Sequence, residues 1–201
     1  MFTINIYLRF ALIGLFLIGG AILAILINFW YAFPLIIVGL VLLAGYLFLG
    51  TVQSAAPMME MMNFDAAEKR LNLTWKPDWL YKTNRAYFYM IKGSISSQKK
   101  DFDAAETHFL KAQSLELPSD NEKAMVCLQL SNIAAAKGNW TGAQMEFKKA
   151  KKYKVTDANL KEQMKEFEKS FKQRGTMKAS QMGGKNQFFR GGGKRRRPRA
   201  R

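Results

Sequence analysis

The N-terminal quarter of this chain has almost no charge: no Asp, Glu, Lys or Arg occurs from residue 10 through residue 59. An uncharged run of this length is too long for one buried helix of a soluble core, and it is typical of segments that cross a lipid bilayer. It divides into two apolar stretches, residues 10–27 and 35–49. Each stretch, with modest extension of the second, is long enough to cross a hydrocarbon layer of about 30 Å. The sequence therefore predicts two transmembrane helices.

The residues that flank the two stretches predict a hairpin with both ends in the cytoplasm. The connection contains Trp30 and Tyr31, which suit the lipid–water boundary, and Pro34, which suits the start of a helix. It has no Lys or Arg, whereas Arg9 precedes the first stretch and basic residues follow the second. The positive-inside rule then predicts a multi-pass protein of the inner, or cytoplasmic, membrane with cytosolic termini. A cleaved signal peptide is disfavoured, because no small-residue cleavage site ends the first stretch.

Cysteine and histidine are nearly absent, and this excludes most enzyme chemistry. Cys127 and His108 are the only residues of their types, so neither an intrachain disulfide nor a Cys/His metal cluster can form. A His-based triad is equally excluded. The glycine clusters follow no predicted strand and precede no GK[ST] motif, so they do not form a phosphate-binding loop. We therefore expect no catalytic residue, no cofactor, no metal and no small-molecule substrate.

Three segments align without gaps and are equally spaced along the chain: 63–74, 101–112 and 139–150. Within each, an aromatic, a small and a second large apolar residue fall at i, i+3 and i+7, on one face of a helix. Asn63, Asp101 and Asn139 come one residue earlier, where a side-chain oxygen can cap the helix. The positions expected to pack the repeats include Phe64, Ala67, Phe102, Ala105, Phe109, Trp140, Ala143 and Phe147.

A further helix is predicted before each of the last two segments, over residues 79–99 and 121–137. In these helices Gly93 and Ser131 precede Ala105 and Ala143 by the same interval, and small residues there allow paired helices to pack closely. The motif Ser119-x-x-Glu122 is a capping box. For the helix of the first segment, the only packing partner expected is the end of the second transmembrane helix, which Pro57 interrupts.

This pattern resembles the tetratricopeptide repeat (TPR) family. The matching residues are Gly93, Phe102, Ala105, Phe109, Ala112 and Pro118, and then Leu130, Gly138, Trp140, Ala143, Phe147 and Ala150. The period of 38 exceeds the family's usual 34, which predicts longer helices or turns. The resemblance implies a short α-solenoid that binds protein segments and does not imply catalysis.

The resemblance also implies that the first helix of each pair lines the partner groove. The groove candidates are Tyr87, Met90, Ser94, Met125, Leu128 and Asn132. The Met and Leu side chains among them are equally compatible with the core. Chaperone adaptors of the family bind C-terminal carboxylates through Lys, Arg and Asn at such positions, and only Asn132 matches. An apolar peptide or helix is the favoured partner segment.

The C-terminal end carries nearly all of the net charge. Residues 148–201 hold 19 Lys/Arg and four acidic residues, so they contribute +15 of the total +16. After Gly175 the apolar periodicity stops, which predicts a flexible Gly/Arg-rich tail. Its phosphate-binding candidates are Arg190, Lys194, Arg195, Arg196, Arg197, Arg199 and Arg201. RNA and anionic lipid are both compatible with these side chains, and so is a solvated tail without a ligand.

The sequence as a whole predicts an all-α protein with three parts: a transmembrane hairpin over residues 1–57, a TPR-like domain over 58–174 that ends in a closing helix, and a basic tail over 175–201. The expected function is that of a membrane-anchored adaptor. Its repeats would bind a protein partner in or at the membrane, and its tail would contact RNA on a membrane-bound ribosome or translocation machinery. The alternative is a structural subunit of a larger membrane complex, with the tail on anionic lipid.

Overall fold

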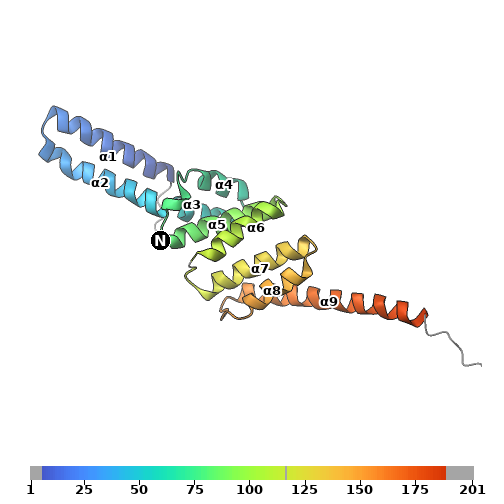
Figure 1. Cartoon of the computed structure of the whole chain (residues 1–201). Coiled ribbons are helices and arrows are strands. Elements are labelled where there is room, and N and C mark those ends of the chain that lie inside the picture. The colour runs from blue at the N-terminus through green and yellow to red at the C-terminus, as the bar shows by residue number, and fades with distance from the viewer. Residues whose placement is uncertain (1–5, 116, 189–201) are drawn as a thin grey trace, which may run out of the picture. The chain divides into compact units, whose positions relative to one another are not determined.

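The computed structural model describes residues 6–115 and 117–188, with side chains described through residue 174. This part of the chain is all-helical, as predicted, and it divides into two units, residues 1–154 and 155–201. Figure 1 shows the order of the helices. Their bounds are α1 (Ile6–Leu26), α2 (Phe29–Leu49), α3 (Val52–Glu60), α4 (Phe64–Asn72), a 3-10 turn (Pro77–Trp79), α5 (Lys82–Gln98), α6 (Phe102–Ser114), α7 (Asp120–Ala136), α8 (Trp140–Ala150) and α9 (Ala158–Phe188).

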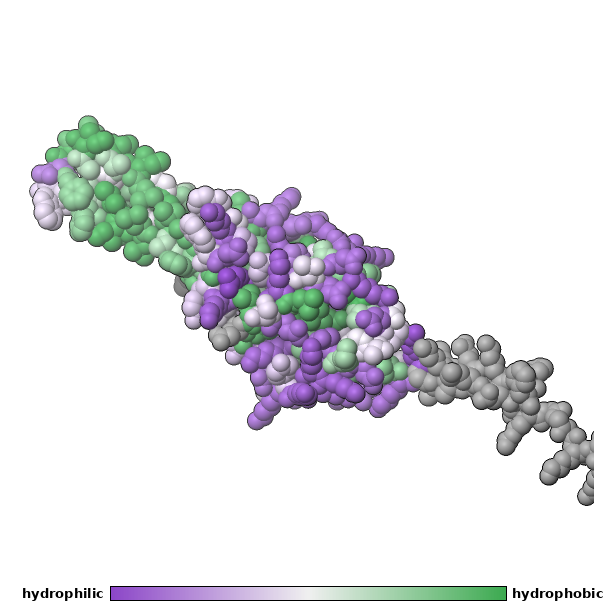
Figure 2. Space-filling model, viewed as in Figure 1, coloured by the Kyte–Doolittle hydropathy of each residue, from purple (hydrophilic) through white to green (hydrophobic). Residues whose placement is uncertain are grey.

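Helices α1 and α2 form an antiparallel pair that is long and apolar enough to cross a membrane. Each has 21 residues, and only 11% of its most apolar window is buried. Figure 2 shows apolar side chains gathered on the surface of this pair. A helix in a soluble core would bury such side chains, so the exposed apolar surface favours contact with lipid.

Glycines bring the two helices close together. A Cβ added to Gly20 would lie 2.8 Å from Cγ1 of Ile36, and one added to Gly39 would lie 2.7 Å from Cδ2 of Leu17. The turn between the helices is shorter than expected, because α2 begins at Phe29 and contains Pro34 in its interior. The predicted helix start at Pro34 is therefore wrong. Proline lacks one backbone N–H, and so close to the N-terminal end the helix forms despite the loss of that hydrogen bond.

The repeat region begins earlier than the sequence indicated. Helix α2 stops at Gly50, whose φ of 64° suits glycine, and the separate helix α3 follows. The expectation that the transmembrane helix itself partners the first repeat is therefore wrong. Ala55 of α3 and Ala67 of α4 are both fully buried, in one core that also contains Val52. The expected domain boundary at residues 57/58 falls inside α3.

Three helix pairs, α3/α4, α5/α6 and α7/α8, share the same turn, which recurs with the period of the sequence repeat. At each turn one residue adopts the left-handed conformation: Met62 with φ 57°, Lys100 with φ 62° and Gly138 with φ 80°. The next residue caps the second helix, as predicted. The Asn63 side chain accepts from Ala66 N at 3.1 Å, Asp101 from Ala104 N at 3.1 Å, and Asn139 from Gly142 N at 2.9 Å.

The predicted small residues allow close packing within the pairs. A Cβ on Gly93 would lie 2.9 Å from the Phe109 ring, while Ser131 Oγ donates to the Ala143 carbonyl at 2.6 Å. Ala67, Ala105, Phe109, Ala143 and Phe147 are buried. The leading aromatic residues Phe64, Phe102 and Trp140 are half-buried.

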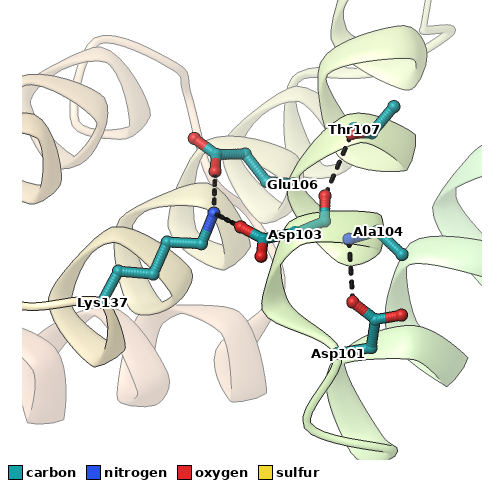
Figure 3. Close-up of polar contacts among 6 residues, drawn as sticks. All are labelled: Asp101, Asp103, Ala104, Glu106, Thr107 and Lys137. Carbon is teal, nitrogen blue, oxygen red and sulfur yellow. Dashed lines mark hydrogen bonds and ion pairs between the residues drawn. The ribbon is translucent and has the colours of Figure 1, made fainter.

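An ion pair also recurs with the repeat. Lys99, directly after α5, bonds Glu68 of α4 at 2.6 Å, and Lys137, directly after α7, bonds Glu106 of α6. Figure 3 shows Lys137 between Glu106 and Asp103, with its ammonium 2.5 Å from the Asp103 carboxylate. Hydrogen bonds to these two carboxylates raise the pKa of Lys137. Ion pairs of this exposure each contribute at most about 1 kcal/mol to stability.

Helix α9 extends the expected closing helix, residues 157–174, to Phe188. The prediction that regular structure ends at Gly175 is therefore wrong. The residues that follow Gly175 include Met, Lys, Ala and Gln, which favour helix, whereas Gly175, Gly183 and Gly184 each oppose it by about 1 kcal/mol. Leu160 and Phe167 of the predicted apolar stripe are buried. Residues 189–201 of the predicted tail lie outside the described part.

The left-handed turn predicts opposite responses to two substitutions. Lys100→Gly should raise the free energy of unfolding by about 0.5–1 kcal/mol, because glycine adopts positive φ without a Cβ penalty. Gly138→Ala should lower it by about 1 kcal/mol or more. Urea unfolding of the full chain in detergent, followed by circular dichroism, measures both. Gln98→Gly, in regular helix, is the control and should destabilise. Equal effects of Lys100→Gly and Gln98→Gly would contradict the role of the turn.

Candidate protein-binding face

The groove candidates lie on α5 and α7, the first helices of the last two pairs. Tyr87 and Ser94 on α5 occupy the same repeat positions as Met125 and Asn132 on α7. Met125 is 37% exposed and Asn132 is exposed, whereas Tyr87 and Ser94 are half-buried. These four side chains, with Glu122 one turn before Met125, define what is called the α5/α7 face below.

The other two candidates belong to the core. Met90 is 7% exposed and Leu128 is 1% exposed, and Met90 packs in one cluster with Phe109 and Val126. The alternative that these apolar residues are core therefore holds for both. Each lies three residues from a position of the α5/α7 face, a spacing that keeps it on the same side of the helix. Helical periodicity alone could not separate the groove from the core.

Tyr87 joins α5 to α7 through Glu122. Its hydroxyl donates to Glu122 Oε1 at 2.6 Å, and the Ser119 hydroxyl donates to the other carboxylate oxygen. Burial and then the hydrogen bond and charge of Glu122 raise the pKa of Tyr87 to about 12. Burial alone would raise the pKa of Glu122, but hydrogen bonds from Ser119 and Tyr87 outweigh it and lower that pKa. Sequence reasoning found Glu122 as a capping residue and missed this link, because the two residues are far apart in the chain.

Most of the α5/α7 face is uncharged. Ser94 Oγ donates to the Met90 carbonyl of its own helix at 3.0 Å, which leaves its outer side polar but neutral. Among the five side chains that define this face only Glu122 carries charge, and its carboxylate is engaged by Tyr87 and Ser119. A surface of Tyr, Met, Ser and Asn side chains offers apolar area and neutral hydrogen-bonding groups. It suits an uncharged or apolar segment better than a charged one.

The chemically reactive side chains are poorly placed for catalysis. Cys127 borders a cavity of about 340 Å³ between Gln113, Leu117 and Tyr153. Burial raises the pKa of the Cys127 thiol, which keeps it protonated and therefore a weak nucleophile. His108 lies parallel to the Tyr89 ring at 6.1 Å, and burial lowers its pKa. Within the described residues no three His, Cys, Asp or Glu side chains lie close enough together to hold a metal ion.

The seven phosphate-binding candidates, Arg190, Lys194, Arg195, Arg196, Arg197, Arg199 and Arg201, lie outside the described residues. Inside that part, a basic stretch already begins at the end of α8 with Lys148, Lys149, Lys151, Lys152 and Lys154, all exposed. Lys149 bonds Glu146 at 2.6 Å, and this contact raises its pKa.

The Tyr87–Glu122 link predicts a pH-dependent contribution to stability. Because the folded-state pKa of Glu122 is lowered, its stabilisation is present above its ordinary pKa of 4.5 and is lost as the pH falls through the folded value. The raised pKa of Tyr87 means that stability also falls as the pH rises from 10.0 toward about 12. Tyr87→Phe should cost about 1 kcal/mol at neutral pH.

The difference between the original chain and Tyr87→Phe should shrink at both pH extremes. Thermal unfolding in detergent at pH 3, 7 and 11 measures it. Tyr81→Phe, at a residue that is 65% exposed, is the matched control and should leave the unfolding midpoint unchanged. A Tyr87→Phe effect that is constant across this pH range would contradict the link.

Comparisons with protein-family models, with curated proteins and with solved structures found no match to this chain. Three features bear on function: the exposed apolar hairpin, the helix pairs that follow it at once, and the α5/α7 face, where Glu122 is the one charged side chain among the five that define it.

Proposed function

We propose that this protein is a membrane-anchored adaptor that holds a partner protein at the membrane through a short TPR-like solenoid. The observation that carries the proposal is the α5/α7 face. It presents Met125 and Asn132 to solvent on the first helix of a repeat pair, beside the half-buried Tyr87 and Ser94. The partner segment is an apolar or uncharged peptide or helix, because a charged segment would lose solvation there without gaining an ion pair.

The proposed location is the cytoplasmic membrane, with both ends of the hairpin on the cytosolic side. The distribution of basic residues supports this orientation. Arg9 lies at the end of the hairpin nearest the repeats, since a Cβ added to Gly45 would be 2.5 Å from its guanidinium nitrogen. The hairpin turn at the opposite end carries no Lys or Arg. The basic C-terminal half would then remain in the cytosol, which the membrane potential favours.

We further propose that the basic tail contacts RNA. This rests on the sequence: six arginines and Lys194 within residues 190–201, beside glycines and Phe188-Phe189. Guanidinium groups bind phosphate through two parallel hydrogen bonds, and the aromatic rings offer stacking to unpaired bases. With cytosolic termini, the ribosome at the membrane is the proposed source of that RNA. Sequence selectivity should be weak, because phosphate contacts carry little base information.

The adaptor proposal predicts loss of a protein partner when charge is added to the α5/α7 face. The full-length protein and the variant Met125→Lys are expressed at native level and purified in mild detergent. We expect a stoichiometric partner with the original chain and at least about a tenfold reduction with the variant, which corresponds to about 1.4 kcal/mol. The matched control is Met145→Lys on α8, where the methionine is 59% exposed.

Two results would contradict the adaptor role. Either the original chain is purified without any stoichiometric partner, or Met125→Lys and Met145→Lys retain the partner equally. A partner lost only after substitutions in α1 or α2 would instead favour a structural subunit held through the hairpin.

The tail proposal predicts ribosome binding that depends on residues 189–201. Full-length protein and a chain that ends at residue 188 are placed in nanodiscs of neutral lipid and tested for co-sedimentation with ribosomes. Binding by the longer chain alone, weakening steeply with salt, is the expected result. Equal sedimentation of the two chains would refute the RNA contact. Tail-dependent binding to anionic liposomes without ribosome binding would assign the tail to lipid.

A further inference from the structure

The loop between α4 and α5 exposes a cluster of aromatic side chains. Trp75 is 70% exposed, Trp79 49% and Tyr81 65%. The two indole rings meet edge to face with centroids 6.0 Å apart. The Lys76 ammonium lies 5.6 Å from the Trp75 ring and 4.7 Å from the Trp79 ring. These four residues are called the aromatic loop below.

Hydrogen bonds hold this loop at the C-terminal end of α2. The Tyr81 N–H donates to the Phe48 carbonyl at 2.9 Å, and Asn84 Nδ2 donates to the Leu49 carbonyl at 3.1 Å. At the other side of the loop, the Tyr46 hydroxyl donates to the Leu73 carbonyl. The first two of these contacts satisfy carbonyls that the end of a helix leaves without partners. The depth of α2 in a bilayer would therefore set the depth of the loop.

A second aromatic cluster lies at the opposite end of α2, about one membrane thickness away. Trp30 is 75% exposed and Tyr31 is 70% exposed, in the first turn of the helix. From Trp30 to Leu49 the helix rises roughly 28 Å at 1.5 Å per residue, close to the 30 Å of a hydrocarbon layer. Tryptophan and tyrosine concentrate at both membrane interfaces, because their rings are apolar and their N–H or O–H groups are polar.

We propose that the aromatic loop docks the first repeat pair into the lipid headgroup region of the membrane that α1 and α2 cross. The inference rests on the proposed membrane-spanning hairpin and adds a second attachment. The indole and phenol rings bury their apolar parts at the interface, while the Lys76 ammonium reaches the headgroup phosphates. Lipid is the favoured binding partner of the aromatic loop, because the loop is hydrogen-bonded to the end of α2, whose own surface is exposed and apolar.

Docking at this loop would determine how the repeats face the membrane. The core that contains Ala55 and Leu71 also contains Leu80 and Phe88, so α3, α4 and α5 form one packed body with the loop at its edge. An anchor formed by α1 and α2 alone leaves the tilt of the repeats relative to the membrane surface unrestrained. A second contact in the headgroup region would restrict that tilt and so fix how the α5/α7 face lies relative to the membrane.

The four tryptophans of the chain, Trp30, Trp75, Trp79 and Trp140, allow a direct test by fluorescence. The full-length protein is reconstituted in phosphatidylcholine vesicles whose acyl chains carry bromine near the headgroup or near the bilayer centre. Trp30→Phe/Trp140→Phe leaves only the loop tryptophans. Trp75→Phe/Trp79→Phe/Trp140→Phe leaves Trp30, and Trp30→Phe/Trp75→Phe/Trp79→Phe leaves Trp140. Circular dichroism verifies that each variant retains its helix content.

The expected result is loss of loop-tryptophan emission with shallow bromine and a smaller loss with bromine at the bilayer centre. Trp30 should behave in the same way, and Trp140 should respond to aqueous iodide instead. Quenching of Trp30 without quenching of the loop tryptophans would overturn the docking inference and leave the hairpin intact. Absence of bromine quenching at both sites would overturn the membrane hairpin and, with it, the docking. If the variants that lack both Trp75 and Trp79 misfold, the difference between Trp140→Phe and Trp30→Phe/Trp140→Phe gives the quenching of Trp30.

Discussion

The apolar hairpin meets the repeats at the last turn of α2. The arrangement of the first helix pair, α3/α4, depends on the groups that donate hydrogen bonds to the free carbonyls of this turn. Gly50 ends the helix with a positive φ and donates its own N–H to the Tyr46 carbonyl at 2.9 Å. Tyr81 and Asn84, from the start of α5, bond the carbonyls of Phe48 and Leu49. Because these bonds satisfy carbonyls that the end of a helix leaves without partners, they favour a short, fixed junction over a free linker.

The equal spacing of the repeats has a physical basis in the turn within each pair. A left-handed residue at Met62, Lys100 and Gly138 reverses the chain, and an Asn or Asp then caps the next helix. A small residue on the first helix faces the second, as Gly93 does toward Phe109. These local requirements recur at equal spacing because each pair must bury the same helix faces against its neighbour. The ion pairs Glu68–Lys99 and Glu106–Lys137 follow the same spacing from one pair to the next.

Packing of successive pairs divides α5 and α7 between core and surface. Met90 and Leu128 are buried, whereas Met125 and Asn132 are exposed, and Glu122 is the one charged side chain among the five that define the α5/α7 face. The proposed uncharged partner segment would bind on that side, whereas the proposed phosphate contact would use the basic residues after Lys148. Protein binding and phosphate binding would then occur at different parts of one anchored chain. The aromatic loop would add a third contact, with lipid.

Features that depend on neighbouring residues or on strict periodicity followed from the sequence by itself. They include the two apolar helices, the caps at Asn63, Asp101 and Asn139, and the close approach of Gly93 to its partner helix. The sequence could not separate Met90 from Met125, since both lie on apolar helix faces and only the packing of α6 and α7 decides which is covered. The Tyr87–Glu122 bond joins residues that are far apart in the chain. The bond from Tyr81 to Phe48, which places the loop with Trp75 and Trp79 beside the end of α2, does so as well. No local propensity encodes such contacts, because they form only when the helix pairs assemble.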